Sequence, residues 1–177
     1  MKILAISGSM RLNSSNTYLL RSIAEIAQPE FKCEIAVGLD VLPIFTPDLE
    51  DIRTPSSVIE FASAIANSDG IIISSPEYVR AIPGGLKNAI DWLVSRDEII
   101  KKPVALVHAS HRGDDMLNSL RSVLSTVSEN FTDSCFLRIP LSSKTVEEME
   151  IVISKAENIA AIKAFVSSYK NHIISSL

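Results

Sequence analysis

The sequence has little of what disulfide-stabilised and metal-binding proteins need. Only two of its 177 residues are cysteines, Cys33 and Cys135, and they lie far apart in apolar surroundings. Two such cysteines provide neither a disulfide framework nor the spacing of a metal site. The three histidines also lack the spacing of metal ligands. We therefore expect both cysteines to be small core residues, and we expect no bound metal.

Charge and hydropathy argue against two further classes of partner. The formal net charge is −4, so no basic surplus is available to neutralise a nucleic-acid backbone or an anionic membrane. No apolar run approaches the roughly 20 residues that cross a bilayer. The apolar run near the amino terminus ends at Ser7, which is too short for a signal peptide. We expect a cytoplasmic protein that binds neither nucleic acid nor membranes.

What the chain does have is an alternation of short apolar runs and helical patterns. Apolar residues recur at helical spacing after each run, which predicts five helices. Thr54 is expected to cap the second helix, and Thr145 to cap a last helix that continues through Val166, with Glu148 completing a capping box. The predicted strands are Lys2–Ile6, Lys32–Val37, Gly70–Ser75, Pro103–His108 and Ser134–Ile139.

This alternation predicts one α/β domain over residues 1–177, a three-layer sandwich in which helices cover both faces of a five-stranded parallel sheet. The usual order for five strands is the flavodoxin-like one, 2-1-3-4-5. That order brings the loops after strands one, three and four around a single crevice. Because these loops carry the unusual polar residues of the chain, their convergence is the strongest indication of a ligand site.

The loop after the first strand, Ser7–Asn16, has the composition of a phosphate site. It combines serine hydroxyls, asparagine amides and the guanidinium of Arg11 at the start of a predicted helix. A helix amino terminus offers unpaired N–H groups and partial positive charge to an anion. Serine and asparagine are also favoured at helix starts that bind nothing, so both interpretations stay open. The loop has neither the dinucleotide fingerprint nor the Gly-Lys-Ser/Thr ending of a P-loop.

The other two loops, Pro76–Gly85 and Ala109–Asp114, have features of a site for a flat ring. Backbone N–H groups of Glu77 and Tyr78 could contact the edge of such a ring, and Tyr78 and Leu12 could form its walls. A nucleotide with one phosphate and a flat ring, such as FMN, fits this layout. The other interpretation is that these loops are ordinary solvated turns.

One connection is more apolar than a free loop should be. It joins the second strand to the second helix, and prolines at positions 43 and 47 make regular structure unlikely there. Its apolar residues are expected to be covered by the domain itself or by a second subunit. Trp92 is expected to be a half-buried helix residue or a subunit contact. The apolar residues of the connection are Leu42, Ile44, Phe45 and Leu49.

Two motifs carry a resemblance to a known family: Ser7-Gly8-Ser9-x-Arg11-x-x-Ser14-x-Asn16, and Pro76-Glu77-Tyr78 followed by Pro83-Gly84-x-Leu86-Lys87-Asn88-Ala89-x-Asp91-Trp92. They resemble the motifs of the NADPH-dependent FMN reductase family, which are flavodoxin-like quinone, azo-dye and chromate reductases. The resemblance covers the first two thirds of the chain. It implies hydride transfer from NADPH or NADH through bound FMN to a quinone, azo, flavin or similar acceptor, in a homodimer or homotetramer. The flavin carries the chemistry, so no catalytic acid or base is expected.

The resemblance also suggests site residues and shows two departures. Many members carry Asn where this chain has Val79, and a glycine-rich third loop where it has His111-Arg112. Arg80 adds a cation, which we hypothesise binds an anionic group of the nicotinamide nucleotide or the acceptor. The predicted cofactor-binding residues are Ser9, Arg11, Ser14, Ser15, Asn16, Pro76, Glu77, Tyr78, Val79, Ser110 and Gly113.

Two other functions stay open at this point. One is a flavodoxin-type electron carrier, which binds flavin without turnover of its own. Flavodoxins favour a loop without a cation, so Arg11 argues against this function. The other is a flavin- or nucleotide-binding protein without catalytic activity.

Overall fold

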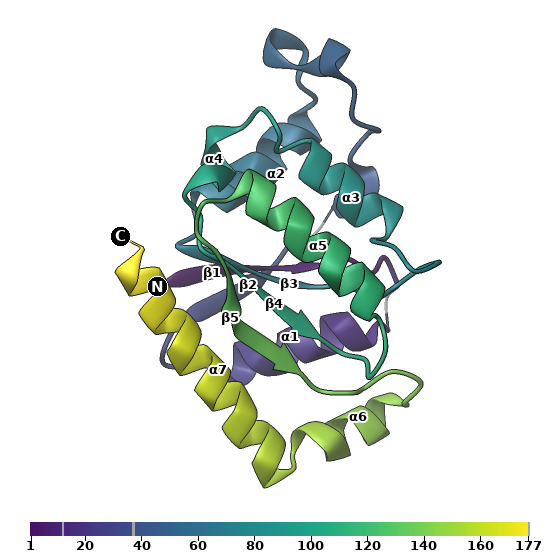
Figure 1. The fold of residues 1–177 in the computed structure, drawn as a ribbon, viewed down its shortest axis with the longest axis vertical. Coiled ribbons are helices and arrows are strands. Elements are labelled where there is room, and N and C mark those ends of the chain that lie inside the picture. The colour runs from purple at the N-terminus through teal and green to yellow at the C-terminus, as the bar shows by residue number, and fades with distance from the viewer. Residues whose placement is uncertain (12, 37, 177) are drawn as a thin grey trace.

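The computed structural model describes residues 1–11, 13–36 and 38–176 and has three layers (Figure 1). A five-stranded sheet forms the middle layer, in the order β2-β1-β3-β4-β5, and every neighbouring pair is parallel. The predicted flavodoxin-like fold class is therefore confirmed. The strands are β1 (Lys2–Ser7), β2 (Lys32–Ile35), β3 (Gly70–Ser74), β4 (Val104–His108) and β5 (Phe131–Arg138).

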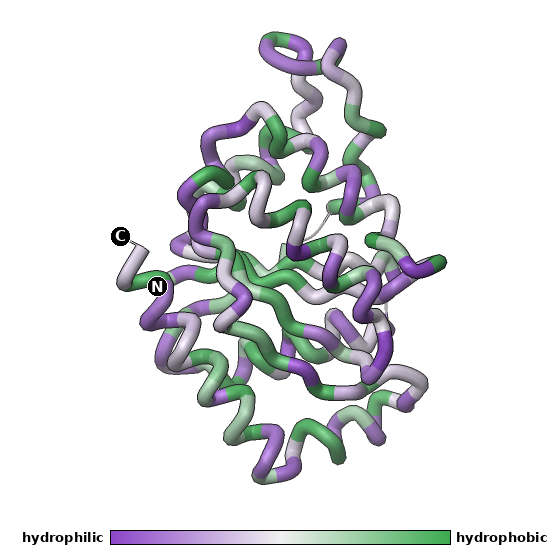
Figure 2. Tube along the Cα trace, viewed as in Figure 1, coloured by the Kyte–Doolittle hydropathy of each residue, from purple (hydrophilic) through white to green (hydrophobic). Residues whose placement is uncertain are grey.

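Helices bury both faces of the sheet, and each face has its own core cluster. In β1, Ile3 and Ala5 belong to one cluster while Leu4 and Ile6 belong to the other, because successive strand residues point to opposite faces. Burial on both faces explains why the central strands are hydrophobic along most of their length (Figure 2). One face is covered by α1 (Ser15–Ile26), α6 (Val146–Ile153) and α7 (Ala156–Ser175), and the other by α2 (Ser56–Ala66), α3 (Gly84–Asp91), α4 (Asp97–Ile100) and α5 (Asp114–Val127).

The predicted last helix is wrong in one respect, because it is two helices. Helix α6 ends at Ile153 and α7 begins at Ala156, since Lys155 has an extended backbone that interrupts the helical hydrogen bonds. Both helices place apolar residues on the same face of the sheet, so the apolar pattern continues across the break. The capping box at Thr145 and Glu148 is confirmed.

Other predicted boundaries also differ. Thr54 is not the N-cap of α2, because its hydroxyl donates to the Asp51 carbonyl and Pro55 occupies the cap position. Strand β2 ends at Ile35, and Val37 lies outside the described residues, as does Leu12. Strand β5 begins earlier than predicted, at Phe131. Short 3-10 turns form in the connection after β2, where no regular structure was expected: η1 (Leu39–Val41), η2 (Pro47–Leu49) and η3 (Asp51–Arg53).

Side chains of α3 fasten this connection to the domain. The Pro43 carbonyl accepts hydrogen bonds from Asn88 Nδ2 (2.9 Å) and Trp92 Nε1 (2.7 Å). The Phe45 N–H donates to Asn88 Oδ1 (2.8 Å), and the Phe45 ring packs edge-on against Trp92. Trp92 is 2% exposed, so it is a core residue and not half-buried as predicted. Ile44 stays exposed within this chain, and the blue segment that follows it protrudes from the body (Figure 1).

Among the described residues, no helix combines the length and the apolar character needed to cross a membrane.

Candidate functional site

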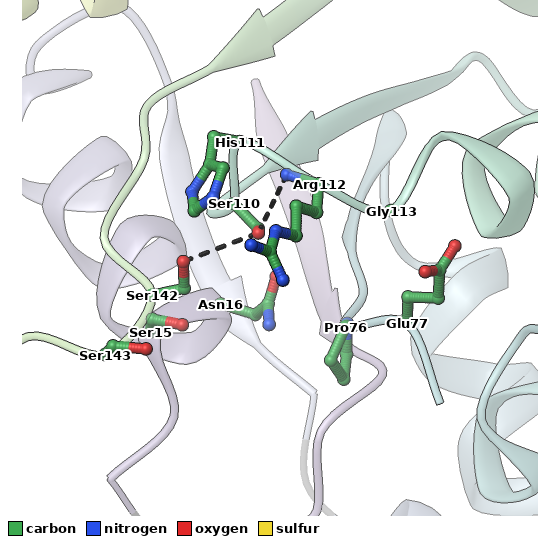
Figure 3. A pocket seen from close by; sticks show the side chains of 10 residues that line it. All are labelled: Ser15, Asn16, Pro76, Glu77, Ser110, His111, Arg112, Gly113, Ser142 and Ser143. Carbon is green, nitrogen blue, oxygen red and sulfur yellow. Dashed lines mark hydrogen bonds between the residues drawn. The ribbon is translucent and has the colours of Figure 1, made fainter. Parts of the chain in front are cut away.

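The loops at the carboxyl edge of the sheet surround a cavity of about 440 Å³. Figure 3 shows its lining side chains, which come from the loops after β3, β4 and β5 and from the first turn of α1. Most of its lining residues carry polar groups, which are hydroxyl, amide, guanidinium, imidazole and carboxylate groups. The lining residues are Ser15, Asn16, Pro76, Glu77, Ser110, His111, Arg112, Gly113, Ser142 and Ser143.

The residues predicted to hold a phosphate are divided among three cavities. Ser15 and Asn16 line the main cavity. Ser9 and Arg11 line a separate cavity of about 290 Å³ near the end of β2. Ser14 lines a third cavity beside α6, and its hydroxyl accepts the backbone N–H groups of Asn16 and Thr17 as the N-cap of α1. Of the residues predicted to bind the phosphate, Ser15 and Asn16 therefore share a cavity with residues predicted to contact the ring, whereas Ser9, Arg11 and Ser14 do not.

Asn16 fastens the first turn of α1 to the end of β3. It is 5% exposed, and its Oδ1 accepts a hydrogen bond from the fully buried Ser74 hydroxyl (2.9 Å). A buried hydroxyl that loses its partner costs about 1–3 kcal/mol, so this bond has structural value without any ligand. The amide is therefore held in a fixed position at the cavity wall.

Gly8 lets the first loop touch the loop after β3. A Cβ added at Gly8 would lie 2.5 Å from Ser75 Oγ and 2.9 Å from Leu86 Cδ2. The Gly8 N–H also donates to the Ser74 carbonyl (2.8 Å). The close approach that Gly8 permits is thus made to the end of the neighbouring strand. The first loop and the loop after β3, which continue to cavity residues at Asn16 and Pro76, are consequently packed directly against each other.

Glu77 joins the loop after β3 to the amino terminus of α5. Its Oε2 accepts a hydrogen bond from the Met116 N–H (3.0 Å), in the first turn of that helix. A carboxylate at this position satisfies one of the unpaired N–H groups and is favoured by the helix dipole. The side chain of Glu77 therefore holds two of the three predicted loops together.

Beyond Glu77 the chain makes a tight two-residue turn. Tyr78 and Ala81 exchange two backbone hydrogen bonds (3.2 and 3.0 Å), and Val79 and Arg80 between them have φ angles of 51° and 60°. Positive φ at both central residues defines a type I′ turn, which favours Asn and Gly. The Arg80 Nε lies 2.6 Å from Asp115 Oδ2 on α5. This ion pair raises the pKa of Arg80 and leaves its charge balanced in the present structure.

Replacing Val79 by Asn is expected to increase the free energy of unfolding by about 1 kcal/mol. A β-branched side chain at positive φ is strained by about 1–3 kcal/mol, whereas Asn tolerates this region. Urea unfolding measures the change. Val94→Asn is the matched control, because Val94 is also exposed but does not have a positive φ. A Val79→Asn protein that is no more stable than the original would show that the turn is not strained.

The loop after β4 rests on His108, the last residue of that strand. His108 is 1% exposed, its Nε2 lies 2.5 Å from the Arg112 carbonyl, and Gly113 packs against its ring. Since a carbonyl only accepts, Nε2 carries the proton of the neutral ring. Nδ1 has no hydrogen-bond partner among the described residues. Burial lowers the pKa of His108, the Arg112 carbonyl opposes this effect, and the nearby Arg138 adds to it.

The depressed pKa of His108 predicts a loss of stability in acid. Below pH 6.5 the unfolded chain binds this proton more tightly than the folded protein, so the stabilisation present above 6.5 is lost as the pH falls toward the folded pKa. We expect the urea midpoint to fall between pH 7 and pH 5. His108→Gln, whose amide can donate to the Arg112 carbonyl but does not titrate, should flatten this fall. Equal falls in both proteins would contradict the assignment.

The loop after β5 contributes a wall that the sequence prediction missed. The backbone N–H groups of Leu141 and Ser142 donate to the Ala109 carbonyl (2.8 and 3.0 Å), which ties this loop to the one after β4. Ser142 and Ser143 then line the cavity. The sequence does contain an indication of this wall, because Ser142 and Ser143 follow the carboxyl end of the fifth predicted strand, at the same edge of the sheet as the other loops.

Comparisons with known proteins agree with the resemblance seen in the sequence. The model of the family described as NADPH-dependent FMN reductase matches residues 1–136. A 2-hydroxy-1,4-benzoquinone reductase of Burkholderia sp is 38% identical over 92 residues, which are 52% of this chain and 49% of that protein. A quinone reductase of Escherichia coli (strain K12) is 32% identical over 116 residues, 64% of this chain and 61% of that protein. The matches thus span about half to three fifths of these relatives.

Two further matches extend over almost the whole chain. An NADPH azoreductase of Bacillus sp. (strain OY1-2) is 26% identical over 175 residues, 96% of this chain and 95% of that protein. The solved structure of FerB, a flavoenzyme NAD(P)H:(acceptor) oxidoreductase from Paracoccus denitrificans, superposes with a TM-score of 0.79 at 22% identity, covering 98% of this chain and 97% of that one. The structural likeness supports the fold. Ser142 and Ser143 lie beyond the segment that the family model matches.

Proposed function

Because this chain belongs to the NADPH-dependent FMN reductase family, we propose that it binds FMN in the cavity of Figure 3 and uses it to oxidise NADPH or NADH. The acceptor in this proposal is a small molecule such as a quinone, an azo compound or a flavin, as the names of the relatives suggest. The observation that carries the proposal is the meeting of the three predicted loops around one polar cavity.

The cavity suits FMN in size and in its donors. Its volume of about 440 Å³ falls in the range of roughly 300–1,000 Å³ that is usual for small-molecule and cofactor sites. At one side the first turn of α1 offers Ser15, Asn16 and backbone N–H groups, which suit a phosphate. On another side the loop after β3 offers Pro76 and Glu77, held against the neighbouring loops. FMN, when bound, supplies the hydride chemistry.

The chain's own residues hold and orient the cofactor in this proposal. Ser15 and Asn16 would bind the phosphate from the main cavity, and Ser9, Arg11 and Ser14 are proposed to reach it from the two other cavities that they line. The ring lies against the loop after β3, and the loop after β4 contributes through its backbone. The hydrogen bond between Asn16 and Ser74 and the close packing at Gly8 fix the relative positions of these loops before any ligand binds. The residues proposed for the ring are Pro76, Glu77, Tyr78, Val79, Ser110 and Gly113.

Arg80 is proposed to meet an anionic group of the nicotinamide nucleotide or the acceptor. Its partner in the present structure is Asp115, and both side chains are largely exposed, at 82% and 47%. An exposed ion pair of this kind is worth about 0–1 kcal/mol, so an anionic ligand can replace Asp115 at little cost. Steady-state constants that are all unchanged in Arg80→Ala would contradict this role.

Titration of the flavin-free protein with FMN and with riboflavin tests the cofactor proposal. We expect saturable binding, with FMN held at least about tenfold more tightly, because charge-assisted bonds to the phosphate contribute about 1.5–3 kcal/mol each. Arg11→Ala should reduce the affinity for FMN about tenfold and leave that for riboflavin unchanged. A protein that binds neither flavin contradicts the proposal, and an unchanged FMN affinity in Arg11→Ala removes Arg11 from the phosphate site.

We also propose that the protein is a homodimer or homotetramer. The connection after β2 and the turn at Val79 present apolar side chains to solvent in this chain. Their relative exposures are 64% for Val41, 86% for Ile44, 101% for Ile52 and 99% for Val79. Light scattering should give at least twice the chain mass of 19.3 kDa, and Ile44→Lys with Ile52→Lys should lower it. A monomeric starting protein would contradict the proposal.

A further inference from the structure

We propose that Arg112 stabilises the reduced form of the bound flavin and thereby raises its reduction potential. This inference rests on the proposed function, because it concerns FMN in the same cavity. Arg112 lies in the third loop, where this chain departs from the glycine-rich pattern of many members of the family.

The side chain of Arg112 points into the cavity. Figure 3 shows its guanidinium extending from the loop after β4 into the space between the Asn16 wall and Pro76. Arg112 forms no ion pair with the part of the chain that the structure describes. Two other arginines at this edge, Arg80 and Arg138, have their charges balanced by Asp115 and Asp114. Arg112 therefore brings an unbalanced positive charge to the cavity.

The backbone of Arg112 is fixed on both sides. Its N–H donates to Ser110 Oγ (3.1 Å), and its carbonyl accepts the Nε2–H of buried His108 (2.5 Å). Gly113, with φ of 104°, follows at once and packs on the same imidazole, where a Cβ would lie 2.9 Å from Nε2. The long side chain thus starts from a rigid position. His108 is a positioning residue in this arrangement, acting through the main chain of Arg112.

The acidic residue of the lining, Glu77, keeps its negative charge but is directed elsewhere. Its carboxylate points away from the Arg112 guanidinium in Figure 3 and accepts the Met116 N–H at the amino terminus of α5. His111 lies on the opposite side of Arg112 from Glu77 and faces the loop after β5 (Figure 3). The hydroxyls of Ser110 and Ser142 are neutral and lie 3.4 Å apart. The charge that reaches the middle of the cavity is accordingly that of Arg112, and a ligand that gains negative charge beside its guanidinium is favoured.

A flavin gains negative charge when a hydride reduces it. A hydride carries two electrons and one proton from the nicotinamide, whose C4–H bond breaks, to the flavin, where an N–H bond forms. The flavin ring gains one negative charge, and the nicotinamide ring gains one positive charge. A cation within a few ångströms favours the more negative form. Arg112 would therefore bind reduced FMN more tightly than oxidised FMN and favour the transfer.

The experiment compares reduction potentials of FMN bound to the starting protein and to Arg112→Gln, by anaerobic titration against a reference dye. In Arg112→Gln we expect the ratio of the affinities for reduced and oxidised FMN to fall about tenfold. For a two-electron couple this lowers the reduction potential of the bound flavin by about 30 mV. Arg112→Lys, which keeps the charge, should recover most of the difference. Lys163→Gln is the control, because it removes one positive charge from the exposed face of α7, outside the cavity.

Each possible result for the Arg112 variants either supports or overturns the role proposed for Arg112. A lower potential in Arg112→Gln alone, with recovery by Lys, supports the proposal. An unchanged potential overturns it. Weaker binding of FMN but not of riboflavin, at an unchanged potential, also overturns it and assigns Arg112 to the phosphate. A starting protein that binds no flavin is a failure of the proposed function, which the flavin titration detects before any potential is measured.

Discussion

Gly8→Val is expected to abolish measurable FMN binding and to lower the free energy of unfolding by about 1–3 kcal/mol, the usual cost of overpacking. Even a Cβ at this position would lie 2.5 Å from Ser75 Oγ and 2.9 Å from Leu86 Cδ2. The serine hydroxyl can rotate away, but Leu86 is 1% exposed, so its side chain can move only by displacing other core residues. We therefore expect the first loop to move away from the loop after β3, which changes the shape of the cavity beside them.

Gly84→Ala is the matched control for this substitution. A Cβ at Gly84 would meet nothing within 4 Å, and Gly84 is the first residue of α3. Alanine there should be neutral or stabilising by up to about 1 kcal/mol, because glycine is a poor helix residue. Urea unfolding and FMN titration of both variants separate the two effects. A Gly8→Val protein that binds FMN normally would show that contact between these loops is not needed for the site.

Trp92→Ala is expected to lower the free energy of unfolding by about 3–5 kcal/mol. Trp92 is 2% exposed, packs against Phe45 with ring centroids 5.1 Å apart, and donates to the Pro43 carbonyl. Its removal leaves a large cavity and frees the connection after β2. Because that connection carries the exposed apolar residues, we also expect the variant to lose its oligomeric state at concentrations where the starting protein keeps it.

Trp92→Phe distinguishes packing from hydrogen bonding at this site. Phenylalanine keeps most of the ring but cannot donate to Pro43, whose carbonyl still accepts from Asn88 (2.9 Å). The expected loss is about 1 kcal/mol, plus the loss from a smaller ring. Chemical unfolding and light scattering of both variants give the comparison. If Trp92→Ala cost no more than Trp92→Phe, the packing of the connection on α3 would not be what holds it.

The sheet could be predicted because its signal is local. The run Ile71-Ile72-Ile73 reflects burial on both faces, and the alternation of runs and helices leaves few topologies. The break between α6 and α7 could not be predicted from periodicity. Lys155 interrupts the helix, yet both helices present their apolar residues to the same layer. Thr54 was misassigned because a hydroxyl near a helix start can bond to the preceding turn instead.

The site was harder to predict because its parts depend on contacts between distant loops. The sequence placed Ser15, Asn16, Glu77 and Ser110 near one edge, and they do line one cavity. It could not show that Asn16 bonds to Ser74, since these residues are 58 positions apart. Nor could composition show that Arg112 faces inward while Arg80 is paired with Asp115. Side-chain direction in a loop is decided by the packing beneath it, here by His108.

The visible spectrum of the FMN-loaded protein, recorded before and after NADPH or NADH is added without air, tests the proposed function directly. We expect the absorbance of bound flavin to bleach within seconds of adding one equivalent of at least one nicotinamide nucleotide, and to return when a quinone is added. Bound flavin that stays oxidised with both nucleotides, yet is bleached by dithionite, would contradict the account and identify the protein as an electron carrier that depends on a separate reductase.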